Sequence, residues 1–172
     1  MRAYTPGGRF DTDFEIKDIH KGITAELTNP VGTTALWYVW NAAASHVDPI
    51  YDVGNNDGVG RQWRTPVVVP IVRAIVAQGS AMVIGRGFYN ADRVHLTVDH
   101  DVLMSLIPDL LNDPDPLNRD RIVWKGEVFR PYNVQQQGIV SERYTLLTFD
   151  CQQVMPEEMV NDPQFQNYAS IG

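Results

Sequence analysis

The side chains of this sequence best suited to chemistry lie in one acidic segment between positions 99 and 120. They are aspartates and one histidine: Asp99, His100, Asp101, Asp109, Asp113, Asp115 and Asp120. Carboxylates and imidazoles bind metal ions and exchange protons. On an extended strand, however, the histidine faces away from its two neighbouring carboxylates, and a metal site needs three or four ligands that converge. Interleaved prolines, a missing loop glycine and a missing final glutamate exclude an EF-hand. We therefore expect a solvated acidic loop that binds no metal.

The other catalytic patterns are incomplete. The glycine-rich residues 54–60 lack the lysine and hydroxyl residue that complete a phosphate-binding loop. Gly85-Arg86-Gly87 lacks the third glycine and the helix of a dinucleotide site. Cys151 stands in a strand pattern without a histidine partner near it in sequence, which is typical of a buried structural thiol. The sequence thus predicts a protein that is not an enzyme and needs no cofactor.

The alternative is a small β-barrel enzyme or ligand-binding module that uses residues 99–118 as a lid. Such a protein needs a deep pocket lined by convergent polar groups. The sequence contains no cluster that would supply these groups.

Charge is distributed unevenly along the 172 residues, whose formal net charge is −7. A negative total argues against tight binding to duplex DNA, because that affinity comes from neutralising phosphates. Residues 61–93 reverse the trend with one acidic residue and five arginines, Arg61, Arg64, Arg73, Arg86 and Arg93. Solvated strand faces are one interpretation of these arginines. A docking surface that pairs with carboxylates of a partner is the other.

The sequence also bears on the compartment. No apolar run approaches the roughly 20 residues that a membrane helix needs, and residues 1–8 lack the apolar core of a signal peptide. The single cysteine excludes an internal disulfide and fits a reducing compartment. We expect a protein made in the cytoplasm of its host cell, with no membrane partner.

Hydrophobic patterning predicts a mainly β fold. Apolar and alternating runs bounded by turn residues are typical of strands, and they lie at residues 67–76, 88–99, 121–124, 127–135 and 139–153. About five antiparallel strands would form a small barrel of the SH3-like or OB-like kind. Lys125-Gly126 would join two of them as a tight hairpin turn, and residues 136–138 would form the next turn.

This pattern divides the chain into three parts. Residues 63–153 form the β-barrel core, with residues 99–118 inserted as a long loop; loops of this length are usually functional or disordered. Residues 1–62 form an N-terminal arm and loop region. Within it, residues 34–45 fit both a short helix and a strand, so both alternatives stay open. Residues 154–172 form a C-terminal docking tail.

Apolar side chains occupy both faces of the first and last predicted strands. A half-exposed antiparallel sheet alternates apolar with polar residues, so these strands need a second cover. Either the arms of the same chain or neighbouring subunits supply it, and both alternatives stay open. We expect the tail to become ordered only against a partner chain. Aromatic and methionine side chains outside the barrel are suited to such docking: Trp37, Trp40, Met155, Met159, Phe165 and Tyr168.

Several stretches, taken in order, resemble proteins of the tailed-phage neck. Residues 120–131, with the Lys125-Gly126 turn, resemble the C-terminal half of head-tail joining proteins, as do the positions that follow up to Asp150-Cys151. Residues 47–52, 95–98 and 156–165 resemble the head-to-tail stopper of phages that infect actinobacteria. The resemblance spans most of residues 36–168 and rests on the order of these motifs.

The resemblance implies a structural subunit of the phage neck with no chemistry of its own. Its copies would form a six-fold ring, or alternatively a twelve-fold one, with the portal or adaptor above and the tail terminator or tail tube below. Contact with packaged DNA would be non-specific at most. The subunit would be assembled in the bacterial cytoplasm and end in the virion neck. A neighbouring connector ring, the adaptor or the tail terminator, is the alternative.

In related stoppers the long loop between barrel strands closes the DNA channel. By position this loop is residues 99–118 here. The resemblance therefore implies that the channel is lined by Asp99, His100, Asp101, Asp109, Asp113 and Asp115.

Overall fold

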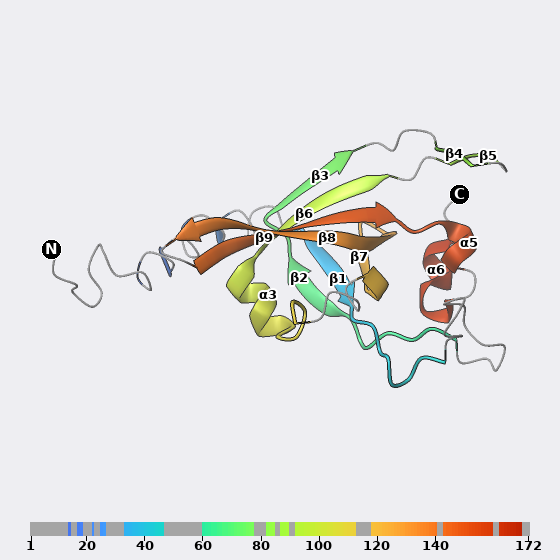
Figure 1. Ribbon diagram of the computed structural model, residues 1–172, viewed down its shortest axis with the longest axis horizontal. Helices are drawn as coiled ribbons and strands as arrows, with labels where there is room; N and C mark the ends of the chain where they lie inside the picture. Colours follow the sequence, from blue (N-terminus) through green and yellow to red (C-terminus); the bar gives the residue numbers. More distant parts are fainter. Residues whose placement is uncertain are drawn as a thin grey trace, which may run out of the picture.

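The computed structural model describes residues 33–46, 60–77, 92–112, 118–140, 143–159 and 162–169, with short pieces at 82–84 and 87–89 and isolated positions between 14 and 26. Within these residues, one antiparallel sheet has the order β2-β1-β7-β8-β9-β6-β3 (Figure 1). Its strands are β1 Thr34–Tyr38, β2 Val67–Pro70, β3 Arg73–Ala77, β6 Arg93–Asp99, β7 Arg121–Trp124, β8 Glu127–Val140 and β9 Arg143–Gln153. A separate pair joins β4, Met82–Ile84, to β5, Gly87–Tyr89. The fold is mainly β, as the sequence predicts.

The described helical elements are short. α3 (His100–Leu106) follows β6 directly, so the predicted insertion at 99–118 begins as a helix. The C-terminal segment contains α5 (Pro156–Met159), a 3-10 turn at Pro163–Phe165 and α6 (Gln166–Ala169). Figure 1 shows α3 below the sheet and α5 and α6 together at one end of it.

The prediction of a closed, five-stranded barrel is wrong. The sheet has seven strands and two edges, β2 and β3, which do not pair with each other. The reason lies at Ile71 and Val72, where the strand predicted at 67–76 changes partner. The backbone N–H of Ile71 donates to the carbonyl of Thr33 beside β1, whereas that of Val72 donates to the carbonyl of Thr97 in β6. One apolar run thus supplies both edge strands.

The segment predicted as either helix or strand contains a strand, β1. It places Ala35 and Trp37 in the main core and Leu36 and Tyr38 against the opposite face. β1 pairs with β2 on one side and with β7 on the other. A strand between two neighbours satisfies its backbone groups and buries apolar side chains on both faces. Part of the predicted N-terminal region is therefore an interior strand of the sheet.

The turn between β7 and β8 is the predicted two-residue hairpin. Trp124 pairs with Glu127 across it. Lys125 and Gly126 have φ angles of 53° and 83°. Positive φ at both central residues marks a type I′ turn, whose twist matches that of the flanking strands. The prediction of this turn is confirmed.

The turn predicted at residues 136–138 is wrong, because β8 continues to Val140 and stays paired with β9. Gly138 has a φ of 69°, and its carbonyl accepts a hydrogen bond from the Thr145 hydroxyl at 2.9 Å. A Cβ at position 138 would clash with that hydroxyl. The glycine marks an irregularity inside a strand, where a second chain segment approaches closely. β8 and β9 consequently form one long ribbon.

The main core fills one face of the sheet, and Trp37 meets Phe149 there edge-on with ring centroids 4.9 Å apart. α3 adds Leu103 to this core. Asp99 begins the helix by accepting hydrogen bonds from the backbone N–H groups of residues 101 and 102. Cys151 is fully buried, as predicted, and burial raises the pKa of its thiol. The buried members are Ala35, Trp37, Val69, Ile71, Val94, Leu96, Val98, Leu103, Ile107, Leu110, Ile122, Trp124, Phe129, Leu147, Phe149 and Cys151.

We expect Gly126→Val to lower the free energy of unfolding by about 1–3 kcal/mol, because a β-branched side chain is strained at positive φ. Lys125→Asn is the matched control, since asparagine tolerates the left-handed region and Asn-Gly favours this turn type. Urea unfolding followed by tryptophan fluorescence measures both variants. Equal stability of the two would contradict the turn assignment.

Candidate docking surfaces

The C-terminal segment packs against the chain's own sheet. Its apolar side chains cover the face of β1, β7 and β8 opposite the main core. We call this second apolar group the tail cluster; it comprises Trp40, Trp63, Val123, Val128, Val154, Met159 and Phe165, with Leu36, Tyr38 and Tyr168 at its margin. The strands predicted to need a second cover, at residues 67–76 and 139–153, contribute nothing to the tail cluster. Val68 and Val76 of the first of them stay exposed, so the source of their cover stays open.

Phe165 is the centre of the tail cluster. Its side chain is fully buried, and its ring lies 4.9 Å from the ring of Tyr38 and 4.9 Å from that of Trp63, both edge-on. Trp63 in turn meets Trp40 edge-on at 5.4 Å. Such pairs contribute beyond the area that they bury. The tail is thus part of the subunit's folded core rather than a free arm.

Polar contacts fix the same segment in register. The backbone N–H of Trp63 donates to the side-chain oxygen of Gln164 at 2.8 Å, and the side-chain amide of Gln164 donates back to the carbonyl of Trp63 at 3.0 Å. This reciprocal pair satisfies both backbone groups of Trp63 beside an apolar cluster. Nothing in the sequence singles out Gln164, because its partner lies about a hundred positions earlier in the chain.

An ionic clamp holds the tail as well. The guanidinium of Arg61 donates two hydrogen bonds to Asp162, at 2.7 and 2.9 Å, and a third to the carbonyl of Glu158 at 3.1 Å. Arg121 donates to the carboxylate of Glu158 at 3.0 Å. A planar guanidinium suits this two-point contact with a carboxylate. Arg61 is one of the arginines predicted to bind a partner, whereas in the structure it binds Asp162 of the same chain.

Burial shifts the pKa values of two side chains of the clamp, Asp162 and Arg121. Burial raises the pKa of Asp162, against the opposing effect of Arg61. Burial likewise lowers the pKa of Arg121 to about 10, against the opposing effect of Glu158, so the guanidinium remains charged at neutral pH. A buried pair of this kind is costly to break from one side, because the remaining charge loses its partner.

The other predicted docking residues divide into buried and exposed sets. Trp37, Trp40, Met159 and Phe165 are buried within the chain, whereas Met155 and Tyr168 are partly buried. The exposed set comprises Arg64, Arg73 and Arg93. Arg86 lies outside the described residues. Docking of a partner on the exposed arginines stays a prediction.

The predicted channel loop is tied to the sheet in its described part. Asp99 is buried as the cap of α3. The Nδ1 atom of the His100 ring is hydrogen-bonded to the carboxylate of Asp101 at 3.0 Å. Asp109 accepts a hydrogen bond from the side-chain amide of Asn112 at 3.3 Å. Asp113 and Asp115 lie outside the described residues. The structure therefore leaves Asp101 and Asp109 exposed and withdraws Asp99 from solvent.

Two kinds of site are absent from the part of the chain that the structure describes. No group of three or more histidine, cysteine, aspartate or glutamate side chains there could hold a metal ion. No helix among the described residues is long and apolar enough to cross a membrane.

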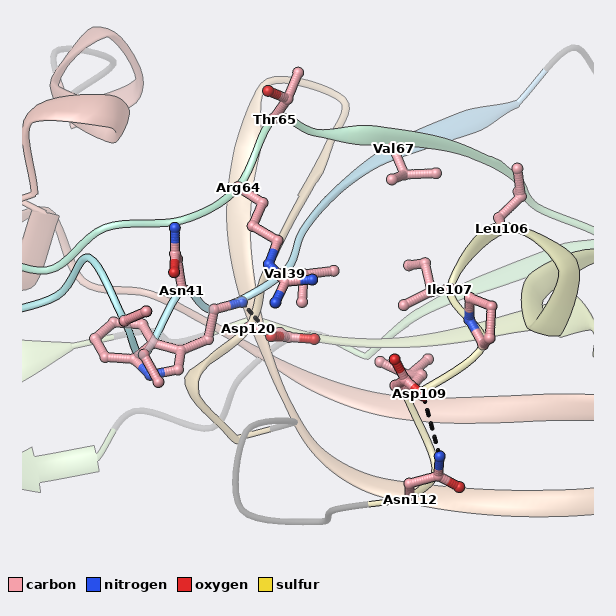
Figure 2. A pocket seen from close by; sticks show the side chains of 15 residues that line it. Val39, Asn41, Arg64, Thr65, Val67, Leu106, Ile107, Asp109, Asn112 and Asp120 are labelled. Atoms are coloured by element: carbon pink, nitrogen blue, oxygen red, sulfur yellow. Dashed lines mark hydrogen bonds between the residues drawn. The ribbon is translucent and has the colours of Figure 1, made fainter.

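A pocket of about 580 Å³ opens beside the C-terminal end of α3 (Figure 2). Its walls are mostly apolar and come from three segments, residues 39–43, 64–67 and 106–112. Asp120 adds a carboxylate, which accepts hydrogen bonds from the indole N–H of Trp37 at 2.8 Å and from the backbone N–H of Trp40 at 2.7 Å. Figure 2 shows Arg64 reaching toward this carboxylate.

Large apolar side chains stay exposed at separate places on the described surface. Ile139 and Tyr144 lie at the free end of the β8–β9 ribbon, and Ile75 and Val76 lie on the edge strand β3. Val68, Val102 and Leu106 lie on β2 and α3, next to the pocket. Figure 1 shows the β8–β9 ribbon and the β3–β6 ribbon extending toward opposite ends of the molecule.

No protein-family model matches the chain, and no curated protein matches it. Among solved structures, it is similar to a chain described as the virion of a native gene transfer agent particle. That likeness has a TM-score of 0.43 and 14% sequence identity, and it covers 70% of this chain and 93% of the other. We take no function from it.

We expect Phe165→Ala to lower the free energy of unfolding by about 3–5 kcal/mol, because it empties the centre of the tail cluster. Asn167→Ala, at an exposed position of α6, is the control and should change stability by less than about 0.5 kcal/mol. Urea unfolding compares them. If both variants unfold like the parent chain, the tail is not part of the folded core.

Asp120 predicts a pH dependence of stability. Burial raises the pKa of its carboxyl from 3.8 to about 6, despite hydrogen bonds from Trp37 and Trp40. The folded state therefore holds the proton more tightly, and the resulting stability is full below about pH 4 and is lost as the pH rises through about 6. A shift of this size corresponds to about 3 kcal/mol.

The measurement is urea unfolding of the parent chain and of Asp120→Asn at pH 4 and pH 7. We expect the stability of the parent to fall by about 3 kcal/mol relative to the variant between the two pH values. Other carboxyls titrate equally in both proteins, so their effects cancel. A difference that does not change with pH would contradict the raised pKa.

Proposed function

We propose that this chain is a structural subunit of the neck of a tailed phage. Its copies form a ring between the portal or adaptor and the tail, close the DNA channel and dock the tail. The observation that carries the proposal is the set of large apolar side chains that stay exposed although the tail already packs on part of the subunit's own sheet. The resemblance of several sequence stretches to stopper and joining proteins indicates that the assembly is the phage neck.

The location of the exposed apolar groups favours a ring. They lie on different sides of the subunit, on the β8–β9 ribbon, on β3 and around α3. When two different surfaces of a subunit bind each other, the copies repeat head to tail. The repeat closes into a ring when the rotation between neighbouring copies allows it. Weak contacts repeated around a closed ring hold it together strongly.

The charge of the chain fits a channel that DNA passes through. The net charge is −7, and Asp101 and Asp109 are exposed on and after α3. An acidic lining repels phosphates, so DNA slides instead of binding. Of the residues that the resemblance implies for the channel lining, Asp99 is buried, and Asp113 and Asp115 lie outside the described residues. His100, Asp101 and Asp109 are the described residues that remain for this role.

Three alternatives differ in their expected structures. An adaptor ring is expected to be mainly helical, which the sheet of this chain does not favour. The tail terminator, one layer away, is compatible with a β-rich subunit. A ligand-binding module is favoured only by the apolar pocket beside α3. Its one buried carboxylate, on Asp120, is already engaged by two tryptophans.

Electron microscopy of the purified full-length chain tests the proposal. We expect rings with a central opening at high protein concentration, and in virions we expect an antibody against the chain to label the junction of head and tail. A chain that stays monomeric at all concentrations and labels no virion neck would contradict the proposed function.

A further inference from the structure

The free end of the β8–β9 ribbon carries an apolar knob. Ile139 and Tyr144 are cross-strand partners near that end, so their side chains lie on one face of the ribbon. Ile139 is 65% exposed, and Tyr144 is 37% exposed. A β-branched aliphatic side chain so far outside the core is not required for the fold of the subunit. We call this pair the ribbon knob.

The pocket beside α3 is a mostly apolar hollow on the same subunit. Val39, Val67, Leu106, Ile107 and Pro108 contribute to its wall. Figure 2 shows Val67, Leu106 and Ile107 grouped on one side of the space. Its volume of about 580 Å³ is in the range of sites that enclose a sizeable apolar group.

The apolar surface continues outside the pocket. Leu106 on its rim is 40% exposed, and Val102, one turn earlier on the same helix, is exposed as well. Val68 on the neighbouring strand β2 is also exposed. An occupant that brings more than one apolar side chain would therefore cover surface both inside the pocket and around it.

Polar side chains also line the pocket, and several of them are already partnered. Asp120 accepts hydrogen bonds from Trp37 and Trp40, and Asp109 bonds with Asn112. Most of the pocket wall is apolar, and an apolar protein side chain needs no polar group to orient it. The pocket is thus better suited to a side chain of another protein.

We propose, resting on the ring function above, that the ribbon knob of one copy occupies the α3 pocket of the next copy. Neither Ile139 nor Tyr144 lines the pocket of its own chain. Knob and pocket are different surfaces, so each copy uses both, one toward each neighbour. Such a heterologous contact repeats around a ring until it closes. It also withdraws the most exposed aliphatic side chain of the described surface from water.

Cysteine cross-linking of the full-length chain tests the contact. The double variant Leu106→Cys with Ile139→Cys places one thiol in the pocket and one on the knob. The native Cys151 is fully buried, and it stays unmodified in the parent chain. With a short bis-maleimide, we expect a ladder of covalent multimers that ends at the ring size. Each single variant should give dimers at most.

The matched control is Val76→Cys with Ile139→Cys, since Val76 is similarly exposed on β3 but lies outside the pocket. A ladder from this pair and none from the first would mean that the knob docks elsewhere. Rings without a ladder from the Leu106 pair would overturn the inference and leave the proposed function standing. No rings and no ladder would overturn both.

A second variant checks the contact without chemical modification. Ile139→Asn keeps the fold, because the side chain is exposed, but it replaces an apolar side chain with a polar one that has no charge for Arg64 of the pocket to pair with. We expect at least about a tenfold rise in the protein concentration needed for half assembly, with an unchanged melting temperature. Assembly at the parent concentration would overturn the proposal.

Discussion

The structure depends on covering both faces of the β1–β7–β8 part of the sheet. On one face, Trp37 and its neighbours form the main core. On the other, Phe165 and Met159 return from the end of the chain to pack on Trp63 and Trp40. A strand buried on both sides cannot be stable until both layers are in place. The C-terminal segment therefore forms one of these two layers, and the Arg61–Asp162 clamp fixes where it lies.

Because the tail is packed inside the subunit, the surfaces available to partners lie elsewhere. The aromatic and methionine side chains that the sequence suggests for docking are mostly buried inside the subunit. Ile139, Val76 and Leu106, in contrast, remain exposed. An assembly subunit needs a stable body and separate contact surfaces. In this chain the tail stabilises the body, and we propose that the ribbons and the α3 region provide the contacts.

Local patterns predicted the local structure well. The Lys125-Gly126 turn follows from a glycine between two apolar runs, and Cys151 is buried because its strand is apolar. What the sequence could not show depends on long-range pairing. Ile71 and Val72 look like the middle of one strand, yet they bond to different partners. Gly138 resembles a turn glycine, but position 138 has no room for a side chain because the hydroxyl of Thr145 on the next strand lies against it. The role of Arg121 is likewise set by Glu158, far along the chain.

Hydrogen–deuterium exchange tests the central claim most directly, by comparing the free subunit with the assembled ring. The amides of Asp162 and Phe165 donate within the tail, to Met159 and Asp162. The account predicts that these amides are already protected in the free subunit and that assembly does not change them. Protection near Ile139 should instead rise on assembly. Fast exchange of the tail in the free subunit, with protection gained only on assembly, would contradict the account.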